Sequence, residues 1–485
     1  MVVSFLALLL LLLLSGSPPS ALAAEDGEHG YTLVEISSLQ EKDVCSGHRV
    51  PVPQNRTWVP LSLLHGSCSP ASLSAHAKPT LAELLRHDEH RVEDIHRRLS
   101  GFADEKKKKI KKRAAGSTST QMNSGPVLDV NMGTLSSTSS QSEVVFQPTA
   151  TGGSSIRRRP PGVRQTVMVD TASDVPWVQC RPCSKPPCRS FDPARSNTYA
   201  AFRCNSTDCA RLGPNANGCF RNQCQYRASS PDGLTSSGTY GSDVLAIGPA
   251  RTIRRFKFGC SRAMRGSIGS AAAGGIMALG GGAQTLVAQT ASAYGNAFSY
   301  CIPPTPSYPG FFTLGSPIAA ASRRFVRTPL VRDGRSPATF HRVLLRGVSV
   351  AGRLLDVPAQ LFAAGTVLDS RTAITRLPLT AYQALRAAFR SSMAAYRKAP
   401  RKGILDTCFN FTGVPVVNLP KVALVFDRNA VLELDPSGIL FNDCLAFASN
   451  ADDTAPGILG NVQQQTIEVL YDLATASVGF RRLAC

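Results

Sequence analysis

The sequence lacks the motifs of several large enzyme classes. It contains no G-x-S-x-G, no P-loop and no G-x-G-x-x-G, and its His87-Asp88-Glu89-His90 run is not the HExxH of zinc peptidases. We expect that run to lie on a helix surface. These absences argue against nucleophile-elbow hydrolases, P-loop and dinucleotide-binding enzymes, and zinc peptidases. We therefore expect no cofactor and no metal.

Long apolar runs are confined to the N-terminus. The ten apolar residues Phe5–Leu14 precede Ala21-Leu22-Ala23, which matches a signal-peptidase site. Because this run is about half of a membrane span, we predict a signal peptide at residues 1–23 rather than a short anchor. No later window reaches span length, so no membrane span is expected. The predicted location is secreted or extracellular, with vacuole or plastid as alternatives, and three N-x-[ST] sequons are glycosylation candidates: Asn55, Asn205 and Asn410.

Acidic residues are scarce: 33 Asp and Glu face 53 Lys and Arg, a net charge of +20. Seven of the basic residues lie in the run Lys106–Arg113. Because so much of the charge is local, the excess is no evidence for a nucleic-acid surface, and no nucleic-acid partner is expected.

Cysteine, in contrast, is abundant, with 14 residues in the chain. Cys180-Arg181-Pro182-Cys183 has the spacing of a zinc or redox CxxC. In an exported chain, disulfides explain such a cysteine count better. The connectivity is not readable from the sequence, apart from one bridge that we predict between Cys408 and Cys444.

Residues 24–150 differ in texture from the rest of the chain. Apolar residues at helical spacing predict a charged helix over Pro79–Ser100. The basic run follows it, and then a Ser/Thr/Gly-rich stretch over Gly116–Ser155. We interpret residues 24–150 as a removable prosegment and polar linker, with dibasic processing sites.

From about residue 156 the pattern is that of a β protein. Short apolar runs separated by Gly, Pro, Asn and Asp predict strands at Phe256–Phe258, His341–Val350 and Val422–Phe426. One helix is expected over Thr380–Lys398. The remaining length suits two lobes, which we place at residues 151–320 and 321–485.

A repeated pattern is the most informative feature. An apolar strand leads into Asp170-Thr171-Ala172-Ser173, and the same pattern returns at Asp369-Ser370-Arg371-Thr372, 199 residues later. Each copy is followed by two apolar residues and a glycine, at Ala278–Gly280 and Ile458–Gly460. The alternative, two unrelated turns, does not explain the shared later element.

Paired carboxylates suggest a chemistry for this repeat. Two aspartates meeting at a two-fold axis cannot both ionise, so they share a proton and activate a water between them. The hydroxyls of Ser173 and Thr372 are placed to donate to the carboxylates of Asp170 and Asp369. Thr171 and Ser370 complete the supporting positions.

These motifs resemble the pepsin-like aspartic proteases, and most closely their plant nepenthesin-type branch. Asp170–Asp174 followed by Trp177–Cys180 corresponds to the first catalytic motif, and the cysteines from Cys180 to Cys224 resemble that branch's Cys-rich insertion. The resemblance extends to further blocks at Phe191–Ser196, Phe258–Cys260, Phe298–Cys301 and Gly457–Gln463. It implies an all-β, bilobal pepsin-like fold with a peptide-binding cleft between pseudo-two-fold-related lobes, and Asp170 and Asp369 as the catalytic dyad.

The sequence also departs from the family pattern at the motifs. Ala172 and Arg371 replace the glycines that follow the two Asp-hydroxyl pairs, and a guanidinium beside the dyad is expected to lower a carboxyl pKa. In the flap, Ser230 takes the place of the family's tyrosine, ahead of Asp232 and Gly233, so Trp177 loses its usual partner. Arg157–Gly162 stands where the family has a strand and a Gly-Thr-Pro loop. We therefore expect the first lobe to lack an edge strand, unless the sequence itself has lost a segment.

Two functions follow from the resemblance. The first is a secreted aspartic endopeptidase, made as a zymogen and acting on a protein or peptide substrate as a monomer. The second is a non-catalytic member that binds a protein partner through the cleft; plant xylanase-inhibitor proteins resemble this fold without being working proteases. Arg371 and Ser230 are the residues that favour the second.

Overall fold

The computed structural model places most of the chain from Gly30 onward. It describes residues 30–40, 44–46, 57–70, 79–104, 125–134, 144–148, 154–158, 162–182, 190–248, 251–266, 273–317, 322–334 and 336–485. The predicted signal peptide, Asn55, the basic run Lys106–Arg113 and Cys183 therefore lie outside the described residues. No helix in the described part is long and apolar enough to cross a membrane.

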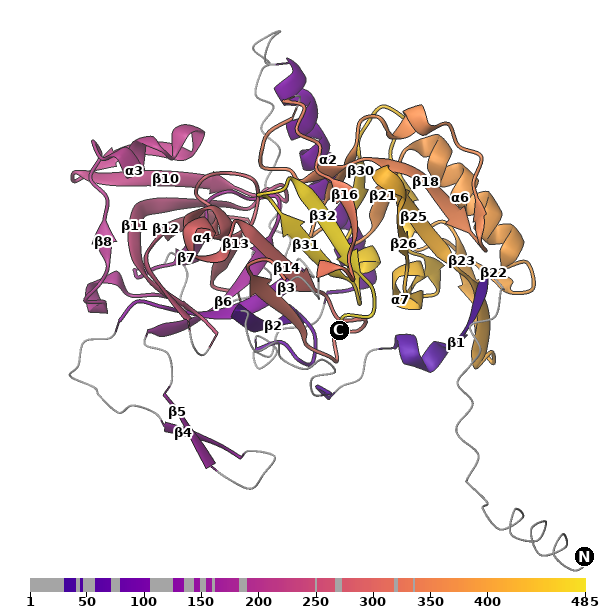
Figure 1. Cartoon of the computed structure of the whole chain (residues 1–485), viewed down its shortest axis with the longest axis horizontal. Coiled ribbons are helices and arrows are strands. Elements are labelled where there is room, and N and C mark those ends of the chain that lie inside the picture. Colours follow the sequence, from indigo (N-terminus) through magenta and orange to yellow (C-terminus); the bar gives the residue numbers. More distant parts are fainter. Residues whose placement is uncertain are drawn as a thin grey trace, which may run out of the picture.

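One large sheet runs through both halves of the molecule (Figure 1). Fourteen of its 15 strands form one path. In spatial order they are β16 (Val326–Pro329), β32 (Ser477–Arg481), β31 (Glu468–Asp472), β14 (Ala297–Cys301), β15 (Gly310–Leu314), β2 (Thr57–Leu63), β3 (Pro126–Met132), β6 (Val163–Asp170), β13 (Gly275–Ala278), β7 (Trp177–Gln179), β12 (Arg251–Arg265), β11 (Thr235–Ile247), β10 (Gln223–Ser229) and β9 (Ala216–Phe220), with β8 (Ala200–Ala201) beside β11.

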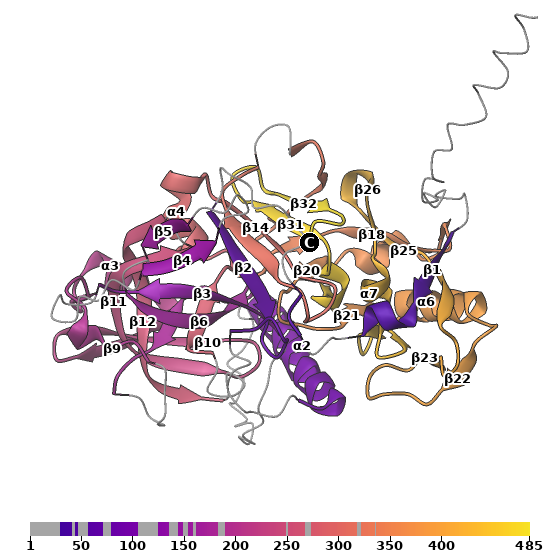
Figure 2. The ribbon, with the colours of Figure 1, turned by 90° about the horizontal axis from the view of Figure 1, so that it is seen from below.

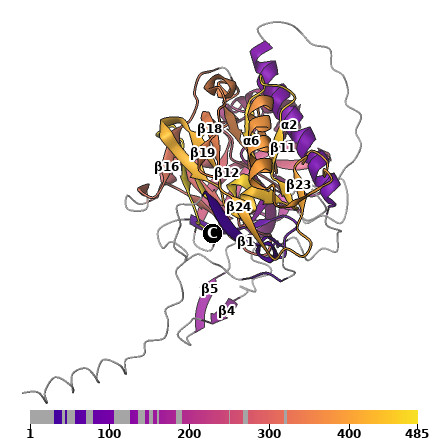
Figure 3. The ribbon, with the colours of Figure 1, turned by 90° about the vertical axis from the view of Figure 1, so that its right-hand side faces the viewer.

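Smaller sheets complete the second half. One has the order β17 (Arg342–Val343), β20 (Thr366–Leu368), β30 (Gly457–Leu459), β21 (Thr375–Leu377), β29 (Phe447–Ser449). Two more are β19 (Arg353–Leu354), β18 (Leu345–Val350), β25 (Val422–Phe426), β26 (Ala430–Glu433), and β22 (Arg397–Ala399), β23 (Cys408–Asn410), β28 (Cys444–Leu445), β27 (Leu440–Phe441). Two pairs stand apart: β1 (Tyr31–Glu35) beside β24 (Val416–Pro420), seen in Figure 3, and β4 (Val144–Pro148) with β5 (Ser154–Arg158).

The predicted repeat exists in three dimensions. β6, which ends at Asp170, lies parallel to β13, and β13 is antiparallel to β7. β20, which ends one residue before Asp369, lies parallel to β30, and β30 is antiparallel to β21. The apolar-apolar-Gly segments are thus the partners of the aspartate-bearing strands, and the all-β expectation is confirmed.

Helices are few and mostly short. Among the described residues, the two long ones are α2 (Leu81–Asp104) and α6 (Leu379–Ser392), and the shorter ones are α3 (Thr207–Ala210), α4 (Leu286–Tyr294) and α7 (Pro436–Ile439). The predicted helix over Thr380–Lys398 ends earlier than expected, because Arg397–Ala399 pairs with β23 as strand β22.

Helix α2 lies over the boundary between the two lobes, as Figures 1 and 2 show from two directions. Its inward face buries Val92, Ile95 and Leu99 in one apolar cluster. Residues from both lobes share that cluster: Ala172 from the first, and Phe340, Val367 and Ile458 from the second. Burial of this stripe holds the helix on the body of the protein.

The expectation that the first lobe lacks an edge strand is wrong. β3 pairs with β6 on the side away from β13, and Gly133-Thr134 follows β3 directly. A Cβ atom built on Gly162 would lie 2.5 Å from the carbonyl oxygen of Gly133. The chain at Gly162, just before β6, therefore lies next to the end of β3. The strand therefore lies upstream of an insertion that carries the β4–β5 hairpin, inside the stretch interpreted as linker.

The docking of α2 gives a first prediction. Ile95→Ala removes a fully buried side chain beneath the helix and is expected to lower the stability of the chain by about 2–5 kcal/mol. Urea unfolding followed by circular dichroism measures this. Arg97→Ala, on the exposed face of the same helix, is the control. Equal unfolding midpoints for the two variants would show that α2 is not held through this face.

Candidate active site

Asp170 and Asp369 occupy equivalent loops and are both fully buried. Backbone N–H groups two or three residues later donate to each carboxylate, from Ala172 to Asp170 Oδ1 at 2.9 Å and from Thr372 to Asp369 Oδ2 at 2.9 Å. The hydroxyls of Ser173 and Thr372 donate to Asp170 Oδ2 at 2.9 Å and Asp369 Oδ2 at 2.5 Å. Each loop thus fixes the orientation of its own carboxylate.

Thr171 and Ser370 connect the two loops. The Thr171 N–H donates to Ser370 Oγ at 3.2 Å, and the Ser370 N–H donates to Thr171 Oγ1 at 3.0 Å. Each hydroxyl in turn donates to a strand carbonyl of the opposite lobe, that of Leu368 or Val169. These reciprocal bonds hold the two aspartate loops in register across the lobe boundary.

Arg91 of α2 lies between the two carboxylates. Its Nε and Nη2 donate to Asp369 Oδ2 and Oδ1 at 2.6 and 2.7 Å, and Nη2 also donates to Asp170 Oδ1 at 2.8 Å. One nitrogen therefore reaches both aspartates, so the distance between their Oδ1 atoms is no greater than the sum of those two bonds. Arg91 is 1% exposed.

Sequence reasoning did not single out Arg91. A signal was present, because Leu84, Asp88, Arg91 and Ile95 recur at helical spacing on the face that Val92 and Leu99 share. Two charged residues in an apolar stripe indicate buried partners. The expectation that His87–His90 lies on the helix surface is accordingly wrong for Asp88, which is buried.

A second cation, Arg371, reaches the same site. Its Nη1 donates to Asp170 Oδ2 at 2.8 Å, and its Nη2 bonds to Asp232 in the turn between β10 and β11. Burial by itself raises the pKa of Asp170, but Arg91 and Arg371 outweigh burial and hold the pKa below the ordinary value. Burial also acts to raise the pKa of Asp232, but the charges of Arg371 and, to a smaller extent, Arg91 outweigh burial and lower that pKa.

The turn that carries Ser230, Asp232 and Gly233 contacts the first aspartate loop. Ser230 Oγ lies 3.2 Å from Ser173 Oγ, and Gly233 closes the turn with a positive φ of 76° and a bond to the Ser230 carbonyl. Arg371 ties Asp232 of this turn to Asp170. Trp177 is buried in the apolar cluster that contains Tyr226 and Leu234.

The two residues that replace the family's glycines fit the local backbone conformation. Neither Ala172 nor Arg371 is among the described residues with positive φ, so neither loop requires glycine for its conformation. The extra methyl of Ala172 packs under α2 instead.

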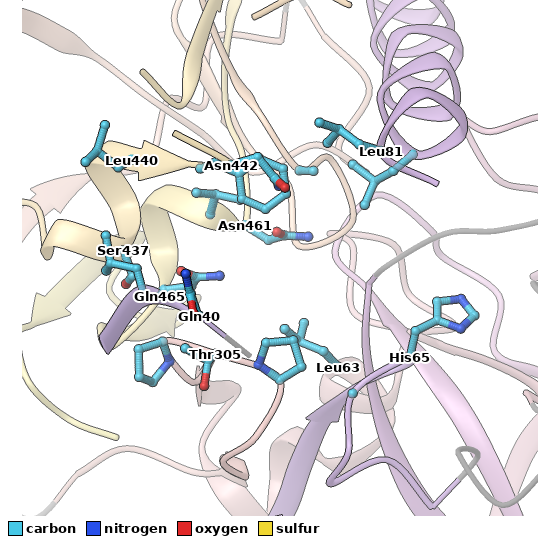
Figure 4. Close-up of a pocket in the computed structure, with 18 of the residues that line it drawn as sticks. Gln40, Leu63, His65, Leu81, Thr305, Ser437, Leu440, Asn442, Asn461 and Gln465 are labelled. Carbon is cyan, nitrogen blue, oxygen red and sulfur yellow. The ribbon is translucent and has the colours of Figure 1, made fainter. Parts of the chain in front are cut away.

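A cavity of about 500 Å³ lies beside the start of α2 (Figure 4). Leu81 and Leu84 of the helix form one wall, and Asn442, Asn461 and Val462 of the second lobe form part of the other. Ala373, in the loop after Asp369, also lines it. The cavity therefore adjoins the candidate active site.

Six disulfides are present in the described residues. They join Cys45–Cys68, Cys180–Cys260, Cys204–Cys219, Cys209–Cys224, Cys301–Cys485 and Cys408–Cys444. The predicted Cys408–Cys444 bridge is confirmed, and Cys180 belongs to a disulfide with Cys260. Of the sequons, Asn205 and Asn410 are exposed.

A two-lobed β structure with an equivalent aspartate loop in each lobe is the arrangement of pepsin-like proteins. Comparisons with known proteins agree with this assignment. The family models described as xylanase inhibitor N-terminal and C-terminal match residues 154–316 and 341–482. An aspartyl protease family protein of Arabidopsis thaliana is 33% identical over 95% of this chain and 94% of its own length. Aspartic proteinase nepenthesin-2 of Nepenthes gracilis is 30% identical over 66% of this chain and 74% of its own.

Solved structures support the same fold. The crystal structure titled edgp matches with a TM-score of 0.57 at 19% identity, over 74% of this chain and 95% of that one. Basic 7S globulin from soybean matches with a TM-score of 0.55 at 22% identity, over the same shares. The chain belongs to the pepsin-like aspartic protease family, which confirms the resemblance drawn from its sequence.

Arg91→Met tests the charge balance of the site. We expect the free energy of unfolding to fall by about 3–5 kcal/mol near pH 7, because a buried ion pair loses one partner. Since the folded-state pKa of Asp170 is lowered, its stabilising contribution is present above the ordinary pKa of about 3.9 and is lost as the pH falls below that value. The difference from wild type should therefore shrink in acid.

Urea midpoints recorded from about pH 7 to about pH 3 measure that difference. Arg86→Met, exposed on the same helix, is the control. A variant-to-wild-type difference that stays constant over the whole pH range would contradict the ion-pair assignment.

Proposed function

We propose that the chain is an aspartic endopeptidase made as an inactive precursor, exported from the cytosol, and acting as a monomer on proteins or peptides. The contact of Arg91 with both Asp170 and Asp369 carries this proposal. The helix that supplies Arg91 lies outside both family-matched regions. The six described disulfides and the apolar N-terminus support export.

Chemistry begins when α2 leaves the cleft. Without Arg91, the two carboxylates share a proton and bind a water between them. The ionised carboxylate takes a proton from the water as it attacks the peptide carbonyl, and the protonated one donates to the carbonyl oxygen. Ser173, Thr372 and the Thr171–Ser370 bonds keep both carboxylates in place during this exchange.

Acid favours release of the helix. Because the pKa of Asp170 is lowered in the docked state, the stability that its pairing with Arg91 contributes declines as the pH falls below the ordinary aspartate pKa, where the undocked chain binds the proton more readily. Burial also lowers the pKa of His96, whose Nε2 lies 3.0 Å from the Pro456 carbonyl oxygen, so His96 disfavours the docked helix below its ordinary pKa of about 6.5. Cleavage in the run Lys106–Arg113 would then detach α2 while leaving β3 in the sheet.

Arg371 limits the proposed activity. It stays on Asp170 after Arg91 has gone, and a carboxylate with a lowered pKa is a weaker general base. Its bond to Asp232 also holds the β10–β11 turn against the site. These contacts favour the second candidate function, a non-catalytic protein that binds a protein partner through its cleft.

Acid processing tests the precursor hypothesis. The purified full-length chain should shorten itself when brought to about pH 3–4, at and below the ordinary aspartate pKa of about 3.9, where the docked helix begins to lose the stabilisation that ionised Asp170 contributes. Asp170→Asn and Asp369→Asn should remain full-length, as seen by gel electrophoresis and N-terminal sequencing. A wild-type chain that stays intact in acid, or variants that shorten at the same rate, would count against a catalytic dyad.

Restoring family residues separates the two functions. Arg371→Gly combined with Ser230→Tyr should raise kcat/KM on a peptide substrate at least about tenfold, because each pKa unit regained by Asp170 is a factor of ten in its affinity for a proton and strengthens it as a general base. Arg346→Gly, at a partly exposed arginine paired with Asp427, is the control. Pepstatin binding at acid pH gives a parallel readout. If the wild-type chain is already active and reversion changes nothing, the non-catalytic function is excluded.

A further inference from the structure

Helix α2 places a second charged side chain in the cleft, one turn before Arg91. The Asp88 carboxylate accepts a bond from the Ala373 N–H at 2.5 Å and one from the Ile374 N–H at 3.4 Å. Its Oδ2 lies 2.9 Å from Arg376 Nη2. Two backbone donors and a guanidinium thus converge on one carboxylate, the pattern of a carboxylate-binding site.

The receptor for this carboxylate is built into the second lobe. Arg376 lies on β21, between β30 and β29, and is 3% exposed. Its Nη1 donates to the Ile374 carbonyl at 2.9 Å, which fixes the guanidinium beside the two N–H groups. Ala373 and Ile374 follow directly on the Asp369 loop, so the receptor is continuous with the candidate active site.

This receptor needs an anion. Among the described residues, Asp88 is the carboxylate that the structure pairs with Arg376. Removal of α2 would leave the Arg376 guanidinium and two N–H groups without that partner, which is energetically unfavourable. A ligand carboxylate in the same place would restore the ion pair and both bonds.

The geometry points to a subsite for an acidic side chain, Asp or Glu, of the peptide that occupies the cleft once α2 has left. The inference rests on the proposed release of the prosegment. In the precursor, Asp88 occupies the subsite as an internal ligand, while Arg91 occupies the dyad.

The position of the subsite follows from the helix. Residues three apart on a helix have Cβ atoms about 5–6 Å apart. An extended peptide covers that distance in about two residues. The acidic residue is therefore expected within about two residues of the bond held at Asp170 and Asp369. The cavity in Figure 4 is lined in part by Ala373, whose N–H belongs to the receptor.

Chemical rescue in the full-length chain tests the receptor without requiring processing or catalysis. Asp88→Ala should lower the melting temperature at pH 7, and formate or acetate should restore part of that loss where chloride at equal ionic strength does not. Asp88→Ala combined with Arg376→Met should gain nothing from formate. Glu89→Ala, exposed on the same helix, is the control and should respond to no anion. Equal responses to formate and chloride in a folded Asp88→Ala chain would overturn the subsite.

Peptide selectivity provides the second measurement. If Asp88→Ala does not fold, this measurement alone tests the subsite. Acid-processed chain should bind a peptide with Glu near the dyad at least about tenfold more tightly than its Gln counterpart, as expected for a charge-assisted contact. Arg376→Met should remove this preference for the Glu peptide over the Gln peptide. A processed chain with no Glu preference would overturn the subsite alone. Rescue by formate in a chain that never processes would instead contradict the proposed function and leave the subsite standing.

Discussion

The charge balance at the lobe boundary is the constraint on which the rest of the structure depends. Asp170 and Asp369 are fully buried, a placement that is unfavourable for ionised carboxylates without cations. Arg91 supplies one cation from α2, and Arg371 supplies another from the second aspartate loop. The helix, the two lobes and the β10–β11 turn therefore meet at one charged cluster.

Arg91 and Arg371 differ in the part of the chain that carries them. Arg91 enters on a helix outside the family-matched regions, whereas Arg371 is part of the aspartate loop itself. Loss of the helix would free the dyad from one guanidinium and leave the other on Asp170. Arg371 also bonds to Asp232, so the β10–β11 turn is connected to Asp170 through this one side chain. Under the proposed function, exposing the two carboxylates and raising the basicity of Asp170 are therefore separate steps.

Local pattern predicted much of the fold and part of the site. The two Asp-hydroxyl loops could be identified because each follows an apolar strand and each is followed later by an apolar-apolar-Gly segment. The structure adds that these segments pair with the aspartate-bearing strands. The helix across the cleft was found from its spacing to within a few residues. The upstream strand β3 was missed, because the insertion carrying β4 and β5 separates it from the motif that it supports. The predicted helix extended to Lys398, but Arg397 and Lys398 lie in strand β22, because pairing with β23 overrides the local helical spacing there.

The sequence by itself determined where the aspartates stand on their strands, since a buried strand followed by a polar turn is written in consecutive residues. Only the tertiary structure decided which charges meet. Arg91 and Asp369 are 278 positions apart, and Asp88 and Ala373 are 285 apart. No local spacing specifies such a pair, because its energy arises only when folding removes water from both partners and leaves each as the other's available counter-charge or hydrogen-bonding partner.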